Sequence, residues 1–266
     1  MRGRYMVRTI TSGAVVEKSK FKVCAQVKPR RSRRKGATPP RKQDQNDRDA
    51  VKRLARVINC NFGHGDLWVT LKYDGARMDR LIAQIHTDGK EPDADTIRAY
   101  AVHDRDLFLR RVRDALKKQG VILRYIKVTS DMDGKTGESV RVHHHLILPA
   151  CARDEVCRQW GADDVRVDTL RGQPDYTPIA KYLIGQVRRI PDAKKYSISR
   201  NMAKPIVKEE IVYTGRELTP PKGAVLMSRA AYEKDTDAQY IRYINPEWER
   251  KQRGSGKNGR TKRGTD

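Results

Sequence analysis

The sequence predicts an α+β fold in which helices cover one face of an antiparallel sheet. Residues 121–129 and 139–148 are rich in apolar and β-branched side chains and flank a turn-rich stretch, so they predict a β-hairpin. Amphipathic helical patterns precede and follow this hairpin. With 266 residues, of which 37% are hydrophobic, the chain can bury a core without disulfide bonds.

Three elements are predicted before the hairpin. Residues 44–58 place apolar side chains at helical spacing behind an Asn- and Asp-rich start, which is typical of a capped helix. Residues 67–73 alternate apolar side chains as a strand does, and Asp74 and Gly75 end this strand. Residues 96–118 predict an amphipathic helix with a basic outward face.

The elements after the hairpin are shorter. Residues 152–160 predict a helix, residues 165–170 predict a short strand, and residues 176–189 predict another helix with an apolar stripe. Beyond Pro191 the pattern becomes irregular, and residues 230–250 show only weak amphipathic spacing. The predicted order is therefore β, α, β, β, α, β, α behind a first helix.

Positive charge is concentrated at the two ends of the chain. Lys and Arg number 57 against 33 Asp and Glu, a net charge of +24, which predicts a polyanion as the partner. Residues 1–42 contribute +13 and residues 249–266 contribute +5. Such runs repel themselves and lack apolar periodicity, so we interpret them as disordered arms that contact phosphates, through residues such as Arg30 and Arg31, or alternatively as solubilising tails.

The chain thus divides into a basic, disordered arm (1–43), a central domain (44–205), a C-terminal extension (206–248) and a basic, disordered tail (249–266). The mean hydropathy of −0.80, with no apolar run near 18 residues, excludes a membrane protein. The N-terminal residues lack the apolar segment of a signal peptide, and the four cysteines lack the spacing of a zinc site. We therefore expect free thiols and a cytoplasmic location.

The run His143-His144-His145 is the most informative feature of the sequence. Because side chains alternate along a strand, His143 and His145 share one face of the predicted hairpin and His144 points to the other. Two neutral imidazoles on one rigid strand can bind a divalent metal ion and leave positions open for an acid, water and a phosphate. The alternative interpretation is a surface strand, or a tag, that happens to hold histidines.

An acidic side chain from a neighbouring strand end would complete such a metal site. Asp131, Asp133 and Glu138 all lie in or near the turn of the hairpin. We prefer Asp131, which directly follows the first strand. Each of the three is also an ordinary turn acid, and Asp133 before Gly134 is typical of a tight turn.

The predicted helix over 176–189 adds a phenol. At helical spacing, Tyr182, Gln186 and Arg189 form one stripe beside the apolar stripe, which places Tyr182 at the boundary between core and solvent. A phenol is a weak nucleophile, but a metal-polarised phosphate lowers the demand on it. Candidate DNA contacts lie on the basic face of the predicted 96–118 helix: Arg110, Arg111, Arg113, Lys117 and Lys118.

The order of four strings resembles the HUH endonuclease superfamily, and most closely its rolling-circle replication-associated (Rep) proteins. The strings are Trp68-Val-Thr-Leu-Lys-Tyr73, Val142-His-His-His-Leu-Ile-Leu148, Ala180-Lys-Tyr182-Leu183 and Lys194-Lys-Tyr-Ser-Ile-Ser-Arg-Asn201. The resemblance covers roughly residues 46–205, and its specificity lies in the combination of the strings. It implies a ferredoxin-like or RRM-like domain that nicks single-stranded DNA.

The resemblance also implies a role for individual residues. His143 and His145 would be the metal-binding pair, and Tyr182 would attack the DNA and become a 5′-phosphotyrosine. The sequence departs from the family pattern at His144, where a hydrophobic residue is usual, and at Gly185, where a lysine is expected. Arg189 or Lys181 is our candidate for the missing cation, and Tyr176 is better explained as a packing residue than as a second nucleophile.

The resemblance implies that this protein initiates rolling-circle replication of a plasmid or phage. The expected cofactor is Mn²⁺ or Mg²⁺, the substrate single-stranded DNA or an origin hairpin, and the partners a host helicase and polymerase. Two alternatives remain open at this point. The first is a non-enzymatic basic protein that binds nucleic acid, and the second is a relaxase or transposase with the same chemistry.

Overall fold

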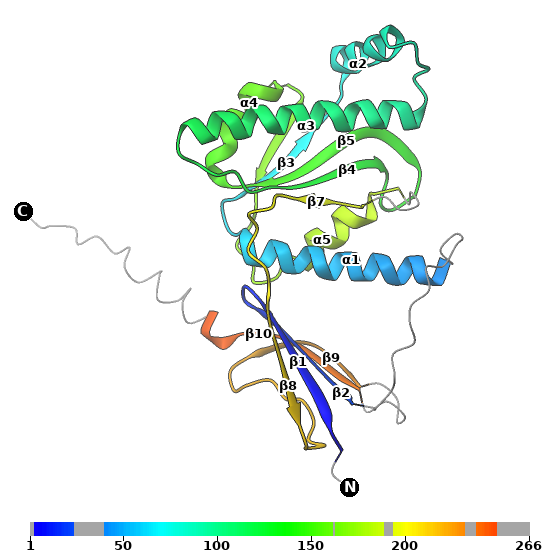
Figure 1. Ribbon diagram of the computed structural model, residues 1–266. Helices are drawn as coiled ribbons and strands as arrows, with labels where there is room; N and C mark the ends of the chain where they lie inside the picture. Colours follow the sequence, from blue (N-terminus) through cyan, green and yellow to red (C-terminus); the bar gives the residue numbers. More distant parts are fainter. Residues whose placement is uncertain (1–2, 24–39, 162, 189–193, 232–237, 249–266) are drawn as a thin grey trace, which may run out of the picture. The chain divides into compact units, whose positions relative to one another are not determined.

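The computed structural model divides the chain into two compact units (Figure 1). The larger unit spans residues 36–203 and the smaller unit combines residues 1–35 with residues 204–266. The larger unit therefore corresponds closely to the predicted 44–205 domain. The structure describes residues 3–23, 40–161, 163–188, 194–231 and 238–248. The predicted tail at 249–266, Arg30, Arg31 and Arg189 lie outside these ranges.

The larger unit is built on a five-stranded antiparallel sheet, so the predicted α+β class is confirmed. The strand order is β6-β3-β5-β4-β7. The strands are β3 (Leu67–Leu71), β4 (Ile126–Met132), β5 (Ser139–Leu148), β6 (Val165–Thr169) and β7 (Ser197–Ile198). β4 and β5 form the predicted hairpin, although β4 begins later in the sequence than expected.

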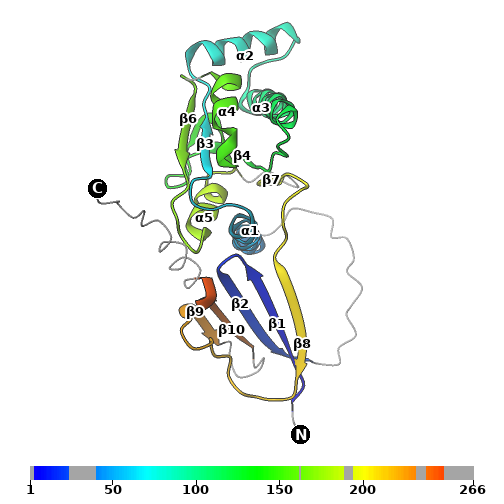
Figure 2. The same cartoon turned by 90° about the vertical axis from the view of Figure 1, so that its left-hand side faces the viewer.

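Helices cover both faces of this sheet, not the one face that we expected (Figures 1 and 2). One face carries α2 (Gly75–Thr87), α3 (Ala94–Lys118) and α4 (Arg153–Trp160), and the other carries α1 (Pro40–Asn61) and α5 (Thr177–Gly185). The physical reason is visible in β5, which ends in the run Leu146-Ile147-Leu148. A strand that is apolar at consecutive positions must be buried on both sides. In the described part of the chain, no helix has the length and apolarity that a membrane crossing requires.

Helix α2 was missed because Asp74 and Gly75 were interpreted only as the end of a strand. Asp74 has an extended backbone and immediately precedes the helix. Gly75, with φ of 37°, lets the chain turn from β3 into α2. Leu81 and Ile85 are the buried residues of α2. The same two residues therefore end the strand and begin a helix.

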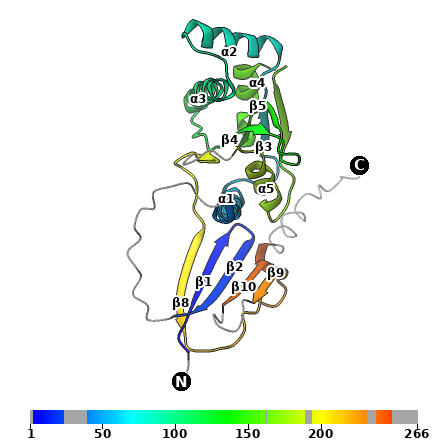
Figure 3. The same cartoon turned by 90° about the vertical axis from the view of Figure 1, so that its right-hand side faces the viewer.

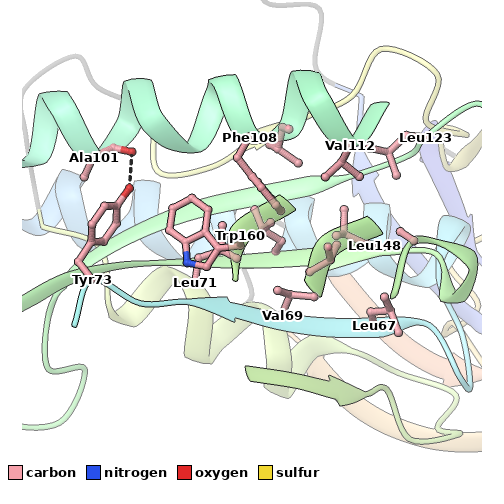
Figure 4. Close-up of a cluster of buried hydrophobic side chains, with 14 of the residues drawn as sticks. Leu67, Val69, Leu71, Tyr73, Ala101, Phe108, Val112, Leu123, Leu148 and Trp160 are labelled. Atoms are coloured by element: carbon pink, nitrogen blue, oxygen red, sulfur yellow. Dashed lines mark hydrogen bonds between the residues drawn. The ribbon is translucent and has the colours of Figure 1, made fainter. Parts of the chain in front are cut away.

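Aromatic side chains fill the core between the sheet and α3 (Figure 4). The ring of Trp160 makes edge contacts with Phe108, at 5.1 Å between centroids, and with Tyr73, at 5.5 Å. Leu67 and Val69 of β3 are fully buried beneath them. Burial of a large apolar side chain contributes about 1.5–3 kcal/mol, so this cluster is a major source of the stability of the larger unit.

A fully bonded polar group, His144, sits in the same core. Its Nε2–H donates to the carbonyl of Ala101 at 3.0 Å, and the hydroxyl of Thr129 donates to its Nδ1 at 3.0 Å. Thr129 in turn accepts a hydrogen bond of 2.6 Å from Arg105. The Tyr73 hydroxyl also donates to the Ala101 carbonyl (Figure 4). Burial, and then the positive charge of Arg105, lower the pKa of His144 well below its ordinary value, so the imidazole is neutral.

The smaller unit is a second five-stranded antiparallel sheet, in the order β8-β1-β2-β10-β9 (Figure 3). Its strands are β1 (Tyr5–Ser12), β2 (Val15–Lys22), β8 (Ile206–Val212), β9 (Val225–Ala231) and β10 (Gln239–Ile244). The prediction of a disordered arm over 1–43 is therefore wrong for residues 5–22, and for the start of α1. The central strand β2 pairs with β1 and with β10, which is more than 200 positions away, and so the 206–248 extension belongs to this unit.

The buried His144 makes the stability of the larger unit depend on pH. The pKa of His144 is lowered in the folded state, so below about pH 6.5 the unfolded chain binds a proton at this residue that the folded chain does not bind. The free energy of unfolding should therefore fall with falling pH, by up to about 1.4 kcal/mol per pH unit for this group. We expect His144→Gln to reduce the difference between about pH 7.5 and about pH 5 by roughly 2 kcal/mol in urea unfolding.

The exposed His86 of α2 offers a matched control for that measurement. His86→Gln should leave the pH dependence of the unfolding free energy as it is in the unaltered chain. An undiminished pH dependence in His144→Gln would contradict the assignment of a neutral buried imidazole.

Candidate active site

The three consecutive histidines of β5 separate onto the two faces of the sheet. His144 enters the core beneath α3, as described above. His143 and His145 lie on the face that carries α5, with 4.9 Å between their ring centroids. On the neighbouring strand β4, Ser130 pairs with His143 and Val128 pairs with His145. The alternation predicted from the sequence is therefore present, and it brings two imidazoles together.

Helix α5 places Tyr182 beside these histidines. The Tyr182 ring lies 5.7 Å from the ring of His145, and Trp68 of β3 contacts both rings at 5.4 and 5.7 Å. Leu183, the next residue of α5, is buried in the core cluster that α1 also lines. Tyr182 is therefore left 50% exposed, with its phenol open to a ligand from solvent.

Tyr176 has a structural role at the start of α5. Its side chain is buried, and its hydroxyl donates to the carbonyl of Arg171 at 3.0 Å. Burial raises the pKa of this phenol. The interpretation of Tyr176 as a packing residue agrees with this position.

The hydrogen bonds of the two histidines indicate which nitrogen atoms can bind a metal ion. Nδ1 of His143 lies 3.0 Å from the carbonyl oxygen of Arg141. A carbonyl only accepts, so Nδ1 carries the proton and the Nε2 lone pair of His143 is left for a ligand bond. The amide oxygen of Gln186 also only accepts, so Nε2 of His145 donates to Oε1 of Gln186 at 2.8 Å, and Nδ1 accepts from the Thr70 hydroxyl at 3.2 Å.

Gln186 is the residue that sequence reasoning missed. It follows Tyr182 by four residues, on the stripe that was predicted, but we assigned it no role. The structure places its amide oxygen next to His145. A Cβ built on Gly134 would lie 3.2 Å from Cγ of Gln186, so the loop between β4 and β5 packs closely against the end of α5, and a larger residue there would require Gln186 to shift slightly.

Burial keeps His145 in the form that binds metal ions. Desolvation, and then the neighbouring His143, lower the pKa of His145 to about 4, while the hydrogen bond with Gln186 acts in the opposite direction. Only the neutral imidazole is a metal ligand. His145 is therefore a neutral imidazole from about pH 5 upward.

Asp131 does not join the two histidines. Its carboxylate is bound by Arg98 of α3 at 2.8 Å and by Arg188, just after α5, at 3.3 Å. The backbone irregularity of the hairpin between Ser130 and Met132 falls at this residue. Among the residues that the structure describes, no three His, Cys, Asp or Glu side chains are grouped as a metal site. Asp131 instead ties the end of α5 to α3.

The other acids considered as ligands also have structural roles or are exposed. Asp133 accepts hydrogen bonds from the backbone N–H groups of Lys135 and Thr136, which lower the pKa of its carboxyl. It is thus the turn acid that its sequence context favours. Glu138 is exposed directly before β5.

The predicted cations are distributed unevenly around the site. Lys181 is exposed on α5 next to Tyr182. At Gly185, where the family pattern has a lysine, a Cβ would meet no other atom within 4 Å, so no neighbouring side chain fills the space of that lysine. Arg110, Arg111, Arg113, Lys117 and Lys118 are exposed, as their assignment as DNA contacts requires. However, α3 covers the face of the sheet opposite to His143, His145 and Tyr182. The basic face of α3 is therefore not beside the phenol.

The site combines two imidazoles, one amide oxygen and one exposed phenol on a single face of the sheet. Nitrogen and oxygen donors of this kind suit a divalent ion such as Mn²⁺, and a phenol near such an ion can attack a phosphate. No protein-family model, no curated protein and no solved structure matches this chain. A function for the protein therefore has to be proposed from these residues and their geometry.

Proposed function

We propose that this protein is a metal-dependent endonuclease that nicks single-stranded DNA through Tyr182 and so initiates rolling-circle replication. The observation that supports this best is the exposed Tyr182 ring 5.7 Å from His145, which itself lies 4.9 Å from His143. These residues come from distant parts of the chain. Their assembly on one sheet face is what a tyrosine nucleophile and a metal-bound phosphate need.

The donor set fits a divalent ion. Nε2 of His143 has no hydrogen on it in the tautomer described above, and the Oε1 of Gln186 faces His145. Metal binding by His145 would replace the hydrogen bond from its Nε2–H to Gln186: the proton would move to Nδ1, which would donate to the Thr70 hydroxyl, and Nε2 would then offer a lone pair to the ion. His143, His145 and Gln186 would therefore hold Mn²⁺ or Mg²⁺. Such an ion supplies polarisation of the scissile phosphate when bound.

Tyr182 carries the covalent step in this proposal. The phenol loses its proton and its oxygen forms a bond to phosphorus, while the bond from phosphorus to the 3′ oxygen breaks and leaves a free 3′-OH. The 5′-phosphate remains on Tyr182, so the phosphodiester energy is kept for later strand joining and ATP is not consumed. Of the two cations that we predicted near the phenol, Lys181 and Arg189, the structure describes Lys181. A host helicase and polymerase would use the released 3′ end.

The nucleophile can be tested directly. We expect the unaltered protein, with Mn²⁺, to form a covalent adduct with a pool of 3′-labelled random-sequence single strands, seen as labelled protein on a denaturing gel. Tyr182→Phe should form no adduct, because the phenyl ring has no oxygen to attack with. Tyr213→Phe, which changes a phenol exposed by 62% in the smaller unit, is the matched control and should retain the adduct.

Two results would count against this proposal. An adduct that persists in Tyr182→Phe would mean that another residue is the nucleophile. Binding of the strands by the unaltered protein without any cleavage, including on hairpin substrates, would favour a non-enzymatic nucleic-acid-binding protein.

The identity of the third metal ligand is open to a separate measurement. We expect Gln186→Met to weaken Mn²⁺ binding by about 10- to 100-fold in calorimetric titration, because the amide oxygen is lost while the side-chain length is kept. Asp131→Asn should leave the Mn²⁺ affinity unchanged, since its carboxylate is engaged by Arg98 and Arg188. The opposite pattern would make Asp131 the ligand, and thermal melts of both variants check that each is folded.

A further inference from the structure

Strand register places three cations on the face of the sheet that carries the candidate active site. Arg166 of β6 pairs with Thr70 of β3, and Thr70 pairs with His145 of β5, so Arg166, Thr70 and His145 form one row across the sheet. Lys72 follows β3 two residues after Thr70. Side chains two residues apart share a face, so Lys72 lies on the same side as this row.

Arg141 of β5 belongs to the same face. Its neighbour Val142 is buried in the core beneath α3, so Arg141 points to the opposite side, where His143 and His145 lie. Its guanidinium lies 3.3 Å from the carbonyl oxygen of Tyr73, directly after Lys72 in the chain. Arg141 and Lys72 therefore flank the same end of the sheet.

The three cations are accessible to a ligand. The side chains of Arg141 and Arg166 are 61% and 69% exposed, and Lys72 is exposed as well. Arg141 is 3.5 Å from Asp74, and Arg166 is 2.8 Å from Asp168. Exposed ion pairs of this kind contribute little to stability, so a phosphate can replace the carboxylate as the partner of each arginine. Figure 2 shows β6 at the edge of the sheet beside β3.

Two aromatic side chains, Trp68 and Tyr182, lie on the same face as these cations. Trp68 pairs with Asp168 on β6 and with Ile147 on β5, one row along from Arg166. Its indole is half-buried and contacts the rings of His145 and Tyr182. Cations that follow a backbone, next to aromatic rings on which bases stack, are the combination that binds unpaired nucleic acid. A duplex keeps its bases stacked inside and gains nothing from the indole.

We propose that Lys72, Arg141 and Arg166 hold the phosphates of a single DNA strand, and that Trp68 stacks on a base near the scissile phosphate. This inference deepens the function proposed above and rests on it for DNA as the substrate. It also replaces the basic face of α3 as the surface that leads the strand to Tyr182. The cations of α3 lie on the opposite face of the sheet.

The test compares two variants of the full chain with equal charge loss. The first is Lys72→Gln/Arg141→Gln/Arg166→Gln, and the second is Lys117→Gln/Arg110→Gln/Arg111→Gln on α3. Binding of a fluorescent random-sequence single strand is followed by anisotropy over a range of salt concentrations, with EDTA present to prevent cleavage. We expect the log–log salt slope to become shallower by about 2 in the first variant, at roughly 0.7 per phosphate, and to change less in the second.

The stacking role of Trp68 is tested with the same assay. We expect Trp68→Leu to weaken single-strand binding by about 5- to 150-fold without changing the salt slope, whereas Trp68→Phe should retain most of the affinity. Unlabelled duplex DNA of the same sequence should compete poorly. Thermal melts establish that both Trp68 variants are folded.

The outcomes separate this inference from the nuclease proposal. Equal loss of slope in the two triple variants, or equal competition by duplex, would overturn the single-strand surface. Equally tight binding of RNA would overturn the choice of DNA. Cleavage that fails while the expected binding pattern holds would reject the nuclease and leave the binding surface standing, because EDTA makes the binding assay independent of Tyr182 chemistry.

Discussion

The burial of β5 on both faces is the constraint on which the rest of the larger unit depends. On one side, His144 is bonded to Ala101 and Thr129 inside the aromatic core. A shift of one residue would carry this imidazole out of its hydrogen bonds and move every apolar side chain of the strand to the wrong face. The register is therefore firmly determined, and His143 and His145 have to face α5. The middle histidine, His144, thereby fixes the positions of His143 and His145.

The position of α5 depends on contacts at its C-terminal end. Gln186 contacts His145, and the β4–β5 loop packs against Gln186 at Gly134. Arg188 then binds Asp131, which also holds Arg98 of α3. These contacts join the two helical layers at the edge of the sheet. A buried carboxylate with two arginine partners is costly to disrupt, since its removal leaves uncompensated positive charge. Asp131 is thus better explained as an anchor of α5 than as a metal ligand.

The smaller unit illustrates how charge can conceal structure. Residues 5–22 alternate side chains as a hairpin does, with Gly13 at φ of 56° in the turn. We counted these residues within a basic arm because the surrounding 1–42 segment carries +13. Their sheet is completed by β8, β9 and β10 from the other end of the chain. Local sequence patterns carry no information about which strands pair over such a separation. Neither the N-terminal nor the C-terminal segment therefore looked like part of a domain.

The sequence by itself determined the α+β class, the β4–β5 hairpin, the separation of His144 from His143 and His145, and the boundary position of Tyr182. All of these follow from local periodicity, which is set by the geometry of strands and helices. Only the tertiary structure decided that helices cover both faces, that Gln186 contacts His145 while Asp131 binds arginines, and that Arg166 shares a face of the sheet with Trp68, which contacts the phenol. These relations depend on which strands pair and which helix packs on which face, and long-range packing decides both.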